Sequence, residues 1–424
     1  MKKKTPAATA PTPAASLTLS LERARAHWWQ RQGLAVPVKG KVDEVVAATG
    51  WPRTLGGSDV YLALRARVPG MARATLDQAV ESGRLQVIPA VRGCIYLVPR
   101  AEVPLVLRVA EEQYRRRTER ELLKVGVKED ELVALGNEVV KALRKGALSP
   151  DALRKALPEG AVRNLGEKGK KLGMSSPLPT ALRYLEFEGK VERTLEGGRL
   201  DSERYDWRLP AKNPFAGAKV PSDPVARNAV IARRFFESAG PATLRELSSW
   251  TALAQKDARL AMDRLPLAPV TIEGYPEEAF VLEEEFPALR GPAPAAKALS
   301  FLPFEDNFIV LHGGPRLFVD PRHHGRTIPV WGTTRGTTLG DATHMSMRTL
   351  VDGARVAGLW EYDPDAKQIV FGTFDPLPPA RRKVVEAQAA DLSRFLREEI
   401  GHARSFVLDT ENALRERARL VKSL

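Results

Sequence analysis

One order of elements recurs three times along this 424-residue chain: helices, and then two short apolar runs separated by glycine. The clearest copy lies at residues 221–296. Its apolar spacing predicts a helix over 224–239, and the runs 268–272 and 279–282 flank a Gly-Tyr-Pro turn, as the strands of a hairpin do. Helices closed by a strand ribbon form a winged helix, so the repeat predicts a tandem array of such units.

The remaining helices of this copy follow from local signals. Thr243 and Glu246 stand in the Thr-x-x-Glu pattern of a capping box, which marks a helix start. Residues 255–265 predict a further helix, which carries Lys256 and Arg259. Both basic side chains are candidates for contacts with the phosphates of DNA.

The middle copy is expected at residues 126–220. Its apolar runs 190–196 and 204–209 bracket Gly197-Gly198, which permits a tight hairpin turn. A helical solenoid is the direct alternative to a winged-helix array. That alternative lacks the glycine-punctuated strand pairs that close each unit.

The first copy, at residues 17–125, is less regular because it contains an additional helix. Its wing strands are expected at 85–90 and 93–98. Helical spacing predicts its four helices over 17–32, 42–49, 59–67 and 71–81.

Residues 297–376 change to short apolar runs separated by Gly, Pro and Asp turns, which predict a small β-barrel or sandwich-like domain. Helical spacing returns in residues 377–424, with helices expected at 379–399 and 411–421. The chain as a whole is therefore expected to be an α+β protein. The strands expected in the β-rich part are 299–303, 308–312, 317–319, 355–360 and 368–371.

Composition restricts where the protein works and what it binds. Residues 1–16 combine a lysine run with Pro, Ala and Thr, which predicts a disordered tail rather than a secretory signal. No later stretch approaches the roughly 18 apolar residues of a membrane span, so we expect a cytoplasmic protein with no membrane partner. A net charge of +13 favours a polyanionic partner, although such a charge also serves solubility.

Motifs for cofactors are missing from the sequence. The single cysteine, Cys94, excludes an internal disulfide and a thiolate zinc cluster within one chain. There is no Gly-Lys-Ser/Thr phosphate loop, no Gly-x-Ser-x-Gly elbow and no dinucleotide fingerprint. We therefore expect no nucleotide, metal or other cofactor.

Several strings, in order along the chain, resemble segments of the AlkZ/YcaQ family of winged-helix DNA glycosylases. They are VYLALRARVPG (60–70), RGCIYLV (92–98), RELSSWTALAQKDAR (245–259), LPFEDNFIVL (302–311), FVDPRHH (318–324) and LVDGARVAGLW (350–360). The resemblance implies three winged helices in a C around a β domain, with duplex DNA in the concave channel. It also implies hydrolysis of the N-glycosidic bond of alkylated purines and interstrand crosslinks, without a cofactor.

The family's catalytic motif, glutamine, a hydrophobic residue and then glutamine or aspartate, should fall just after Gly50. Pro52 and Thr54 occupy its two polar positions, and neither replaces glutamine directly. Proline offers no donor or acceptor, and threonine has one short hydroxyl where a group must orient water or stabilise a positively charged sugar. Thr54 and the nearby Asp59 are the candidate catalytic residues, although an N-terminal helix cap is the alternative for Asp59.

Other candidates for DNA contact lie throughout the chain. Arg53 and Trp51 flank the motif position, and Trp51 also fits an apolar core. In the middle unit a glycine-containing loop at about 163–173 allows close approach to phosphate. His323 and His324 could donate to a phosphate or a base, and we do not expect them to bind a metal because too few ligands surround them. The basic candidates in the loop are Arg163, Lys168, Lys170 and Lys171.

Two hypotheses of different classes follow. The first is a DNA-repair glycosylase for alkylated or crosslinked bases with a divergent catalytic motif. The second is a non-catalytic protein that binds duplex DNA, in which the scaffold remains and the motif glutamines are lost. A transcriptional regulator is a third alternative, and it is disfavoured because no dimerisation segment is evident and we expect a monomer.

Overall fold

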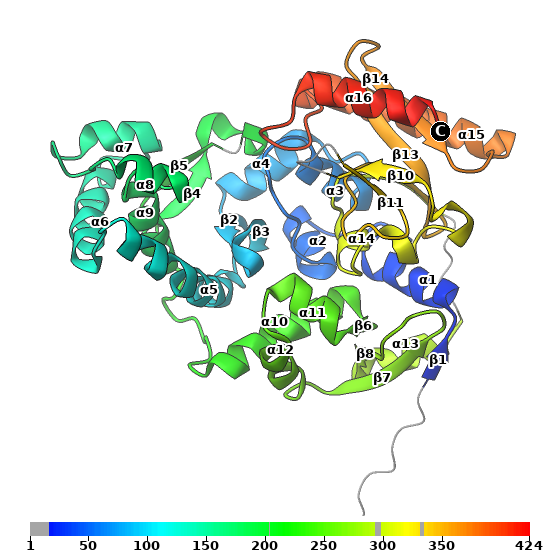
Figure 1. The fold of residues 1–424 in the computed structure, drawn as a ribbon, viewed down its shortest axis with the longest axis horizontal. Helices are drawn as coiled ribbons and strands as arrows, with labels where there is room; N and C mark the ends of the chain where they lie inside the picture. The colour runs from blue at the N-terminus through cyan, green and yellow to red at the C-terminus, as the bar shows by residue number, and fades with distance from the viewer. Residues whose placement is uncertain (1–16, 203, 293–297, 331–334) are drawn as a thin grey trace, which may run out of the picture.

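The computed structural model describes residues 17–202, 204–292, 298–330 and 335–424, so the expected tail at 1–16 lies outside the described residues. Within these ranges the chain is a mixed α+β protein with two four-stranded and three two-stranded sheets. Figure 1 shows α6 to α9 at one side of the body, α10 to α13 below it, and α15 and α16 above it. The boundaries of the expected domains stay predictions.

The first unit has the expected helices, and α2 and α3 have the expected bounds. One prediction is wrong: residues 17–19 begin no helix but form strand β1 (Leu17–Leu19), which pairs in parallel with β7 of the third unit. The other elements of the first unit are α1 (Leu21–Arg31), α2 (Val42–Thr49), α3 (Asp59–Arg67), α4 (Arg73–Glu81), β2 (Leu85–Pro89) and β3 (Ile95–Pro99).

A long helix, α5 (Val103–Lys124), leads to the second unit. The antiparallel ribbon of β4 and β5 forms where the Gly-Gly turn predicts it. The prediction that the basic cluster lies in a loop is wrong in part, because residues 166–171 form a short helix, α8. The elements of this unit are α6 (Glu129–Leu143), α7 (Pro150–Ala156), α8 (Gly166–Lys171), α9 (Leu178–Phe187), β4 (Glu192–Leu195) and β5 (Tyr205–Arg208).

The third unit begins with α10, which an aspartate caps and which ends before Gly240. The capping box of Thr243 and Glu246 is confirmed, with each side chain bonded to the backbone of the other residue. Its sheet has the order β1-β7-β8-β6 and so includes the N-terminal strand. The elements are α10 (Pro224–Ala239), β6 (Ala242–Thr243), α11 (Leu244–Thr251), α12 (Gln255–Met262), β7 (Leu267–Ile272), β8 (Ala279–Leu282) and α13 (Phe286–Arg290).

The C-terminal part contains an open antiparallel sheet of order β14-β13-β12-β9 and a separate hairpin of β10 and β11. No closed barrel is present among the described residues. Two strand predictions are wrong: 308–312 lies largely in a short helix, α14, and 317–319 follows a 3-10 turn. The strands are β9 (Leu299–Leu302), β10 (Thr327–Pro329), β11 (Gly336–Thr338), β12 (Arg348–Asp352), β13 (Arg355–Asp363) and β14 (Gln368–Thr373); the helices are α14 (Asn307–Val310), α15 (Pro379–Phe395) and α16 (Glu411–Lys422).

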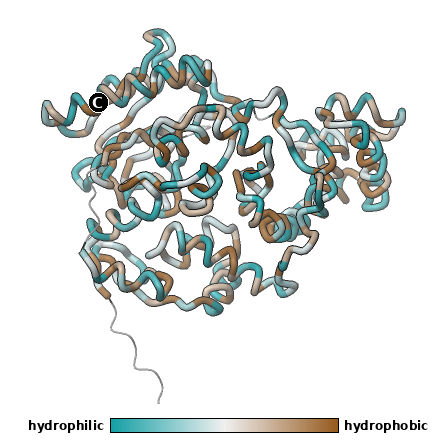
Figure 2. The backbone as a smooth tube through the Cα atoms, turned by 180° about the vertical axis from the view of Figure 1, so that it is seen from behind, coloured by the Kyte–Doolittle hydropathy of each residue, from teal (hydrophilic) through white to brown (hydrophobic). Residues whose placement is uncertain are grey.

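Two apolar cores hold these parts together. The larger includes Val46 of the first unit, Leu182 of the second and Phe235 of the third, so the three units share buried surface. The smaller core joins α1, the third unit's sheet and the C-terminal sheet. In Figure 2 the peripheral helices alternate between apolar and polar residues, as helices with one buried face do.

The described residues contain no helix that is both long and apolar enough to cross a membrane.

Candidate active site

The segment at the motif position lies extended beside strand β3. The backbone N–H of Thr54 donates to the carbonyl of Ile95 over 3.1 Å, and the N–H of Leu97 donates to the carbonyl of Pro52 over 3.1 Å. Proline fits at position 52 because this pairing uses only its carbonyl. We call residues 50–58 the motif segment.

Side chains alternate along an extended segment, which decides what each motif residue can reach. Pro52 and Thr54 are buried, whereas Arg53 between them is partly exposed. The hydroxyl of Thr54 has no hydrogen-bond partner among the described residues. The strand pairing therefore directs Arg53, rather than the two polar motif positions, toward the open side.

Arg53 faces a pocket of about 350 Å³ that also includes Glu305 and His344. We call this the motif pocket. Its walls come from the motif segment, from the turn after β9, from the β10–β11 hairpin and from the residues before β12. Small-molecule sites range from about 300 to 1,000 Å³, so the motif pocket is large enough for a single small organic group.

Glu305 is the carboxylate of the motif pocket. Its side chain is 11% exposed, forms an ion pair with Arg53 and lies with Oε1 3.2 Å from Nδ1 of His344. Burial favours the neutral acid, but His344 and Arg53 outweigh it and hold the pKa of Glu305 below its ordinary value. The pocket therefore contains an ionised carboxylate at neutral pH.

Glu305 also has an unusual backbone, with a φ of 54°. This left-handed conformation is uncommon outside glycine and costs about 1–3 kcal/mol. Such strain persists only where the surroundings enforce it, and it clusters at functional sites. Here the neighbouring Asp306 caps α14 and binds Arg67 through both oxygens at 2.9 Å, which fixes the turn.

The guanidinium of Arg53 pairs with Glu305 and is largely shielded from solvent. Its side chain is 19% exposed. Burial alone would lower the pKa of Arg53, but Glu305 outweighs that effect and raises it. The predicted contact between Arg53 and DNA stays a prediction; the observed partner of the guanidinium is a carboxylate.

Asp59 lies in the first turn of α3, and its side chain is 11% exposed, as is that of Glu305. Its Oδ1 accepts a hydrogen bond of 2.6 Å from Nη2 of Arg348, and its Oδ2 accepts one of 2.9 Å from the N–H of Phe304. Burial outweighs Arg348 and raises the pKa of Asp59 to about 6. The alternative role of an N-terminal cap is wrong, because Ser58 precedes the helix in that position.

A small cavity separates Asp59 from the motif pocket. It measures about 30 Å³ and also has Arg53, Arg67 and Glu305 in its walls. A cavity needs roughly 10–15 Å³ to hold one water, so this space suits water but not a base. Asp59 and Thr54 stay predictions as catalytic residues.

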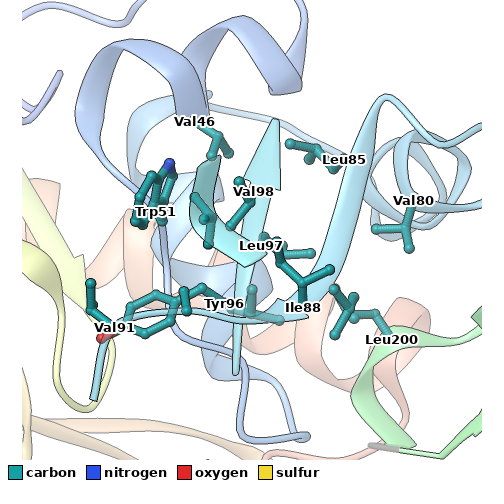
Figure 3. Packing of buried hydrophobic residues seen from close by; sticks show 14 of the residues in the cluster. Val46, Trp51, Val80, Leu85, Ile88, Val91, Tyr96, Leu97, Val98 and Leu200 are labelled. Carbon is teal, nitrogen blue, oxygen red and sulfur yellow. The ribbon is translucent and has the colours of Figure 1, made fainter. Parts of the chain in front are cut away.

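Trp51 lies in the core. It is 2% exposed, and its indole N–H donates to Glu102 over 2.9 Å. Figure 3 shows its ring packed beside Tyr96 and Val98 at the β2–β3 ribbon. The predicted contact with DNA is untested, but the ring presents almost no surface to a ligand in this arrangement.

The basic candidates of the second unit are exposed on or near α8. Arg163 binds Glu131, with Nε to Oε1 at 2.7 Å, and Lys170 binds Glu167 at 2.7 Å. Lys168 and Lys171 are exposed and have no ion pair among the described residues, so both are available to another partner.

The remaining candidates lie elsewhere. Lys256 and Arg259 are exposed on α12, at the bottom of Figure 1, while α8 lies at one side. In the C-terminal part, Nε2 of His323 lies 3.0 Å from Asp375, and Nε2 of His324 lies 3.1 Å from the carbonyl of Arg316. Among the described residues, no group of three or more His, Cys, Asp and Glu side chains is arranged to hold a metal ion.

The structure brings Arg53, Thr54 and Asp59 together and leaves the other candidates dispersed. Sequence reasoning missed Glu305 and His344. Glu305 stands inside the string LPFEDNFIVL, but it lies 252 positions from Arg53, and local spacing gives no sign of the pairing.

Comparisons with known proteins identify the fold and the family. No curated protein matches the chain. Among solved structures, the Streptomyces sahachiroi DNA glycosylase AlkZ matches with a TM-score of 0.64 and 19% identity, covering 92% of this chain and 98% of that chain, which shows a shared fold. The family model "DNA glycosylase AlkZ-like" matches residues 52–395, so the chain belongs to the AlkZ-like DNA glycosylase family.

Proposed function

We propose that this protein is a DNA glycosylase that removes a damaged base from duplex DNA and uses Glu305 in place of the glutamines that the family resemblance leads us to expect at the motif position. Membership of the AlkZ-like family supports the reaction class. The single observation that carries the site assignment is the ionised Glu305, held by Arg53 and His344 on the wall of a pocket beside the motif position.

The chemistry requires a group that stabilises positive charge on the sugar and positions water. As the bond from C1′ to the base nitrogen breaks, the base leaves with the bonding electrons and the sugar gains positive charge. Glu305 is placed to stabilise that charge and to orient the water whose oxygen bonds to C1′. The water's proton passes to a carboxylate or to solvent, and the product is an abasic site.

Asp59 is the second candidate for the base. Its raised pKa suits proton transfer near neutral pH. Against it, the cavity beside Asp59 measures only about 30 Å³, whereas Glu305 also borders the larger motif pocket. Thr54 is weaker still, because its hydroxyl is fully buried.

The partner in this proposal is double-stranded DNA, bound by a monomer whose three helix-and-ribbon units are winged helices. The net charge of +13 supports phosphate contacts, as do the exposed Lys168, Lys171 and Lys256, which have no ion pair among the described residues. Alkylated purines and interstrand crosslinks are the proposed lesions. No cofactor is required for this hydrolysis.

The test is excision of N7-methylguanine from a duplex, and unhooking of an interstrand crosslink, with alkali cleavage at abasic sites. The wild-type protein should form abasic product. Glu305→Gln should lower the single-turnover rate by about 100-fold or more, as the loss of one electrostatic stabiliser does, and should leave DNA affinity nearly unchanged. Glu386→Gln is the matched control, since Glu386 is 53% exposed on α15 and pairs with the exposed Arg382.

The competing proposal is a duplex-binding protein without activity, and the presence of Pro52 and Thr54 favours it. Salt-dependent binding without product on either substrate would establish that alternative. If Asp59→Ala abolishes excision and Glu305→Gln leaves its rate unchanged, the catalytic role belongs to Asp59 instead.

A further inference from the structure

A loop at residues 403–409, between α15 and α16, is bonded directly to the motif segment. The N–H of Ser58 donates to the carbonyl of Arg404 over 2.7 Å, and the N–H of Val407 donates to the carbonyl of Leu55 over 3.0 Å. At Gly57, a side-chain Cβ would lie 2.4 Å from the carbonyl oxygen of Arg404, so the two backbones touch. We call residues 403–409 the anchored loop.

The anchored loop is also braced internally. The N–H of Ser405 donates to Asp409 over 3.0 Å, and Asp409 in turn pairs with Arg417 at 2.7 Å. The carbonyl of Ala403 accepts from Arg348 over 2.8 Å. The loop therefore has a fixed shape and a fixed position relative to the motif segment.

Despite this bracing, the tip of the anchored loop exposes two adjacent apolar side chains. Leu408 is 78% exposed and Val407 is 40% exposed. Single exposed apolar side chains are common on protein surfaces, so this adjacent pair is informative through its place beside the motif segment.

The tip lies close to the motif pocket. Leu55, which bonds to Val407, lines that pocket, and so does Phe304, whose ring lies 6.0 Å from the ring of Phe406. The Leu55–Val407 hydrogen bond and the Phe304–Phe406 ring contact therefore hold the tip beside the pocket.

The surface beside the tip is basic. A wide groove of about 740 Å³ runs along the anchored loop and includes Lys367, Arg404 and Arg397, the last of which is paired with Glu398. Lys367 and Arg404 have no ion pair among the described residues. The two acids of the groove, Asp409 and Glu411, are bound to Arg417 and Arg415 and so are neutralised locally.

We propose that Leu408, with Val407, is a wedge that enters the base stack of the duplex while a nucleotide occupies the motif pocket, with Lys367 and Arg404 on the adjoining phosphates. This inference rests on the proposed function. A base that leaves the stack opens a gap, and an inserted apolar side chain fills it and offsets the unstacking. The rigid backbone means that the wedge needs no ordering on binding.

The test compares Leu408→Ala with Leu123→Ala, a matched control because Leu123 on α5 is also 78% exposed. Single-turnover excision is measured on a fully paired duplex and on the same lesion in an unpaired bubble. On paired DNA Leu408→Ala should be slower by about tenfold, because the wedge no longer offsets unstacking, and in the bubble it should match wild type. Leu408→Phe should retain the paired-DNA rate, and Leu123→Ala should change neither rate.

A rate that falls equally on both substrates, or on neither, overturns the wedge. A second readout separates its failure from failure of the proposed function. 2-Aminopurine beside the lesion brightens when it unstacks, whether or not excision follows. Brightening by wild type but not by Leu408→Ala supports the wedge even if no abasic product forms; equal brightening by both, or brightening by neither, contradicts it.

Discussion

Nη2 of Arg348 donates a 2.6 Å hydrogen bond to Oδ1 of Asp59, a residue 289 positions earlier in the chain. Nη1 of the same arginine donates to Glu361 over 2.7 Å, and Arg348 and Glu361 are each 1% exposed. One buried cation thus joins α3, β12 and β13. Helix α3 and the C-terminal sheet are held together by charge as well as by apolar packing.

Replacement of Arg348 by methionine leaves two carboxylates buried without their shared partner. We expect a loss of roughly 3–5 kcal/mol in the free energy of unfolding, which is typical when one member of a buried ion pair is removed. Urea denaturation measures it. Arg355→Met is the control, because Arg355 is 44% exposed and should change stability by about 0.5 kcal/mol or less. A loss below about 1 kcal/mol for Arg348→Met contradicts the bracing role.

The pH dependence of excision distinguishes the two candidate carboxylates. Each acts in its ionised form, so the rate falls as the pH drops through the pKa of the group responsible. The pKa of Asp59 is raised to about 6, whereas that of Glu305 lies below its ordinary value. With Glu305 in the role, single-turnover rates should stay level down to about pH 5. A decline centred near pH 6 favours Asp59 instead.

His27 makes stability sensitive to mild acid. Burial lowers its pKa from 6.5 to about 4, with Arg31 and Arg23 contributing, so the unfolded chain binds the proton more readily than the folded protein. The stability that the neutral ring contributes is present above pH 6.5 and is lost as the pH falls toward 4. Relative to His27→Leu, wild type should lose about 2 kcal/mol between pH 7 and pH 5. Parallel pH profiles for the two proteins refute this.

Replacement of Trp51 distinguishes a role in core packing from a direct contact with DNA. Trp51→Ala removes a ring that packs against Trp250 at 5.7 Å and should cost about 3–5 kcal/mol of stability. The affinity of the remaining folded protein for undamaged duplex should stay near that of wild type. A stable variant with weakened DNA binding would restore the predicted contact between the ring and DNA.

The exposed lysines of α8 test the DNA surface. Lys168→Ala should weaken binding to all duplex sequences alike and reduce the slope of log affinity against log salt by about 1, the value for one lost phosphate contact. The double variant with Lys171→Ala should reduce it by about 2. Fluorescence anisotropy across a salt series measures the slope, and an unchanged slope places α8 outside the interface.

Sequence reasoning succeeded where structure is local. The capping box at Thr243, the Gly-Gly turn between β4 and β5 and the bounds of α2 and α3 depend on neighbouring residues, and all are confirmed. It failed at 308–312, where Asp306 caps a helix that the apolar run alone does not reveal. It failed also at 17–19, where the partner strand lies in another unit.

Only some of the residues of the candidate site could be predicted from the sequence. The motif position expected at Pro52 and Thr54, and the departure from the motif there, are predictions that the sequence alone supplies. The carboxylate that pairs with Arg53 could not be predicted, because Glu305 lies in a turn far away in the sequence and has a strained backbone conformation. Helix and strand periodicity predicts which face of an element is buried, but not which two turns meet across a pocket.

The parallel pairing of Leu17–Leu19 with β7 also has a consequence for how the protein is made. During translation, the first strand emerges from the ribosome long before Leu267–Ile272, its neighbour in the sheet, has been synthesised. Closing a loop of about 250 residues costs roughly 3 kcal/mol more than closing one of about ten residues, so the pairing waits both for synthesis of the partner strand and for the packing that offsets this cost. Until then the nascent chain carries an unpaired strand edge, a surface that chaperones can protect.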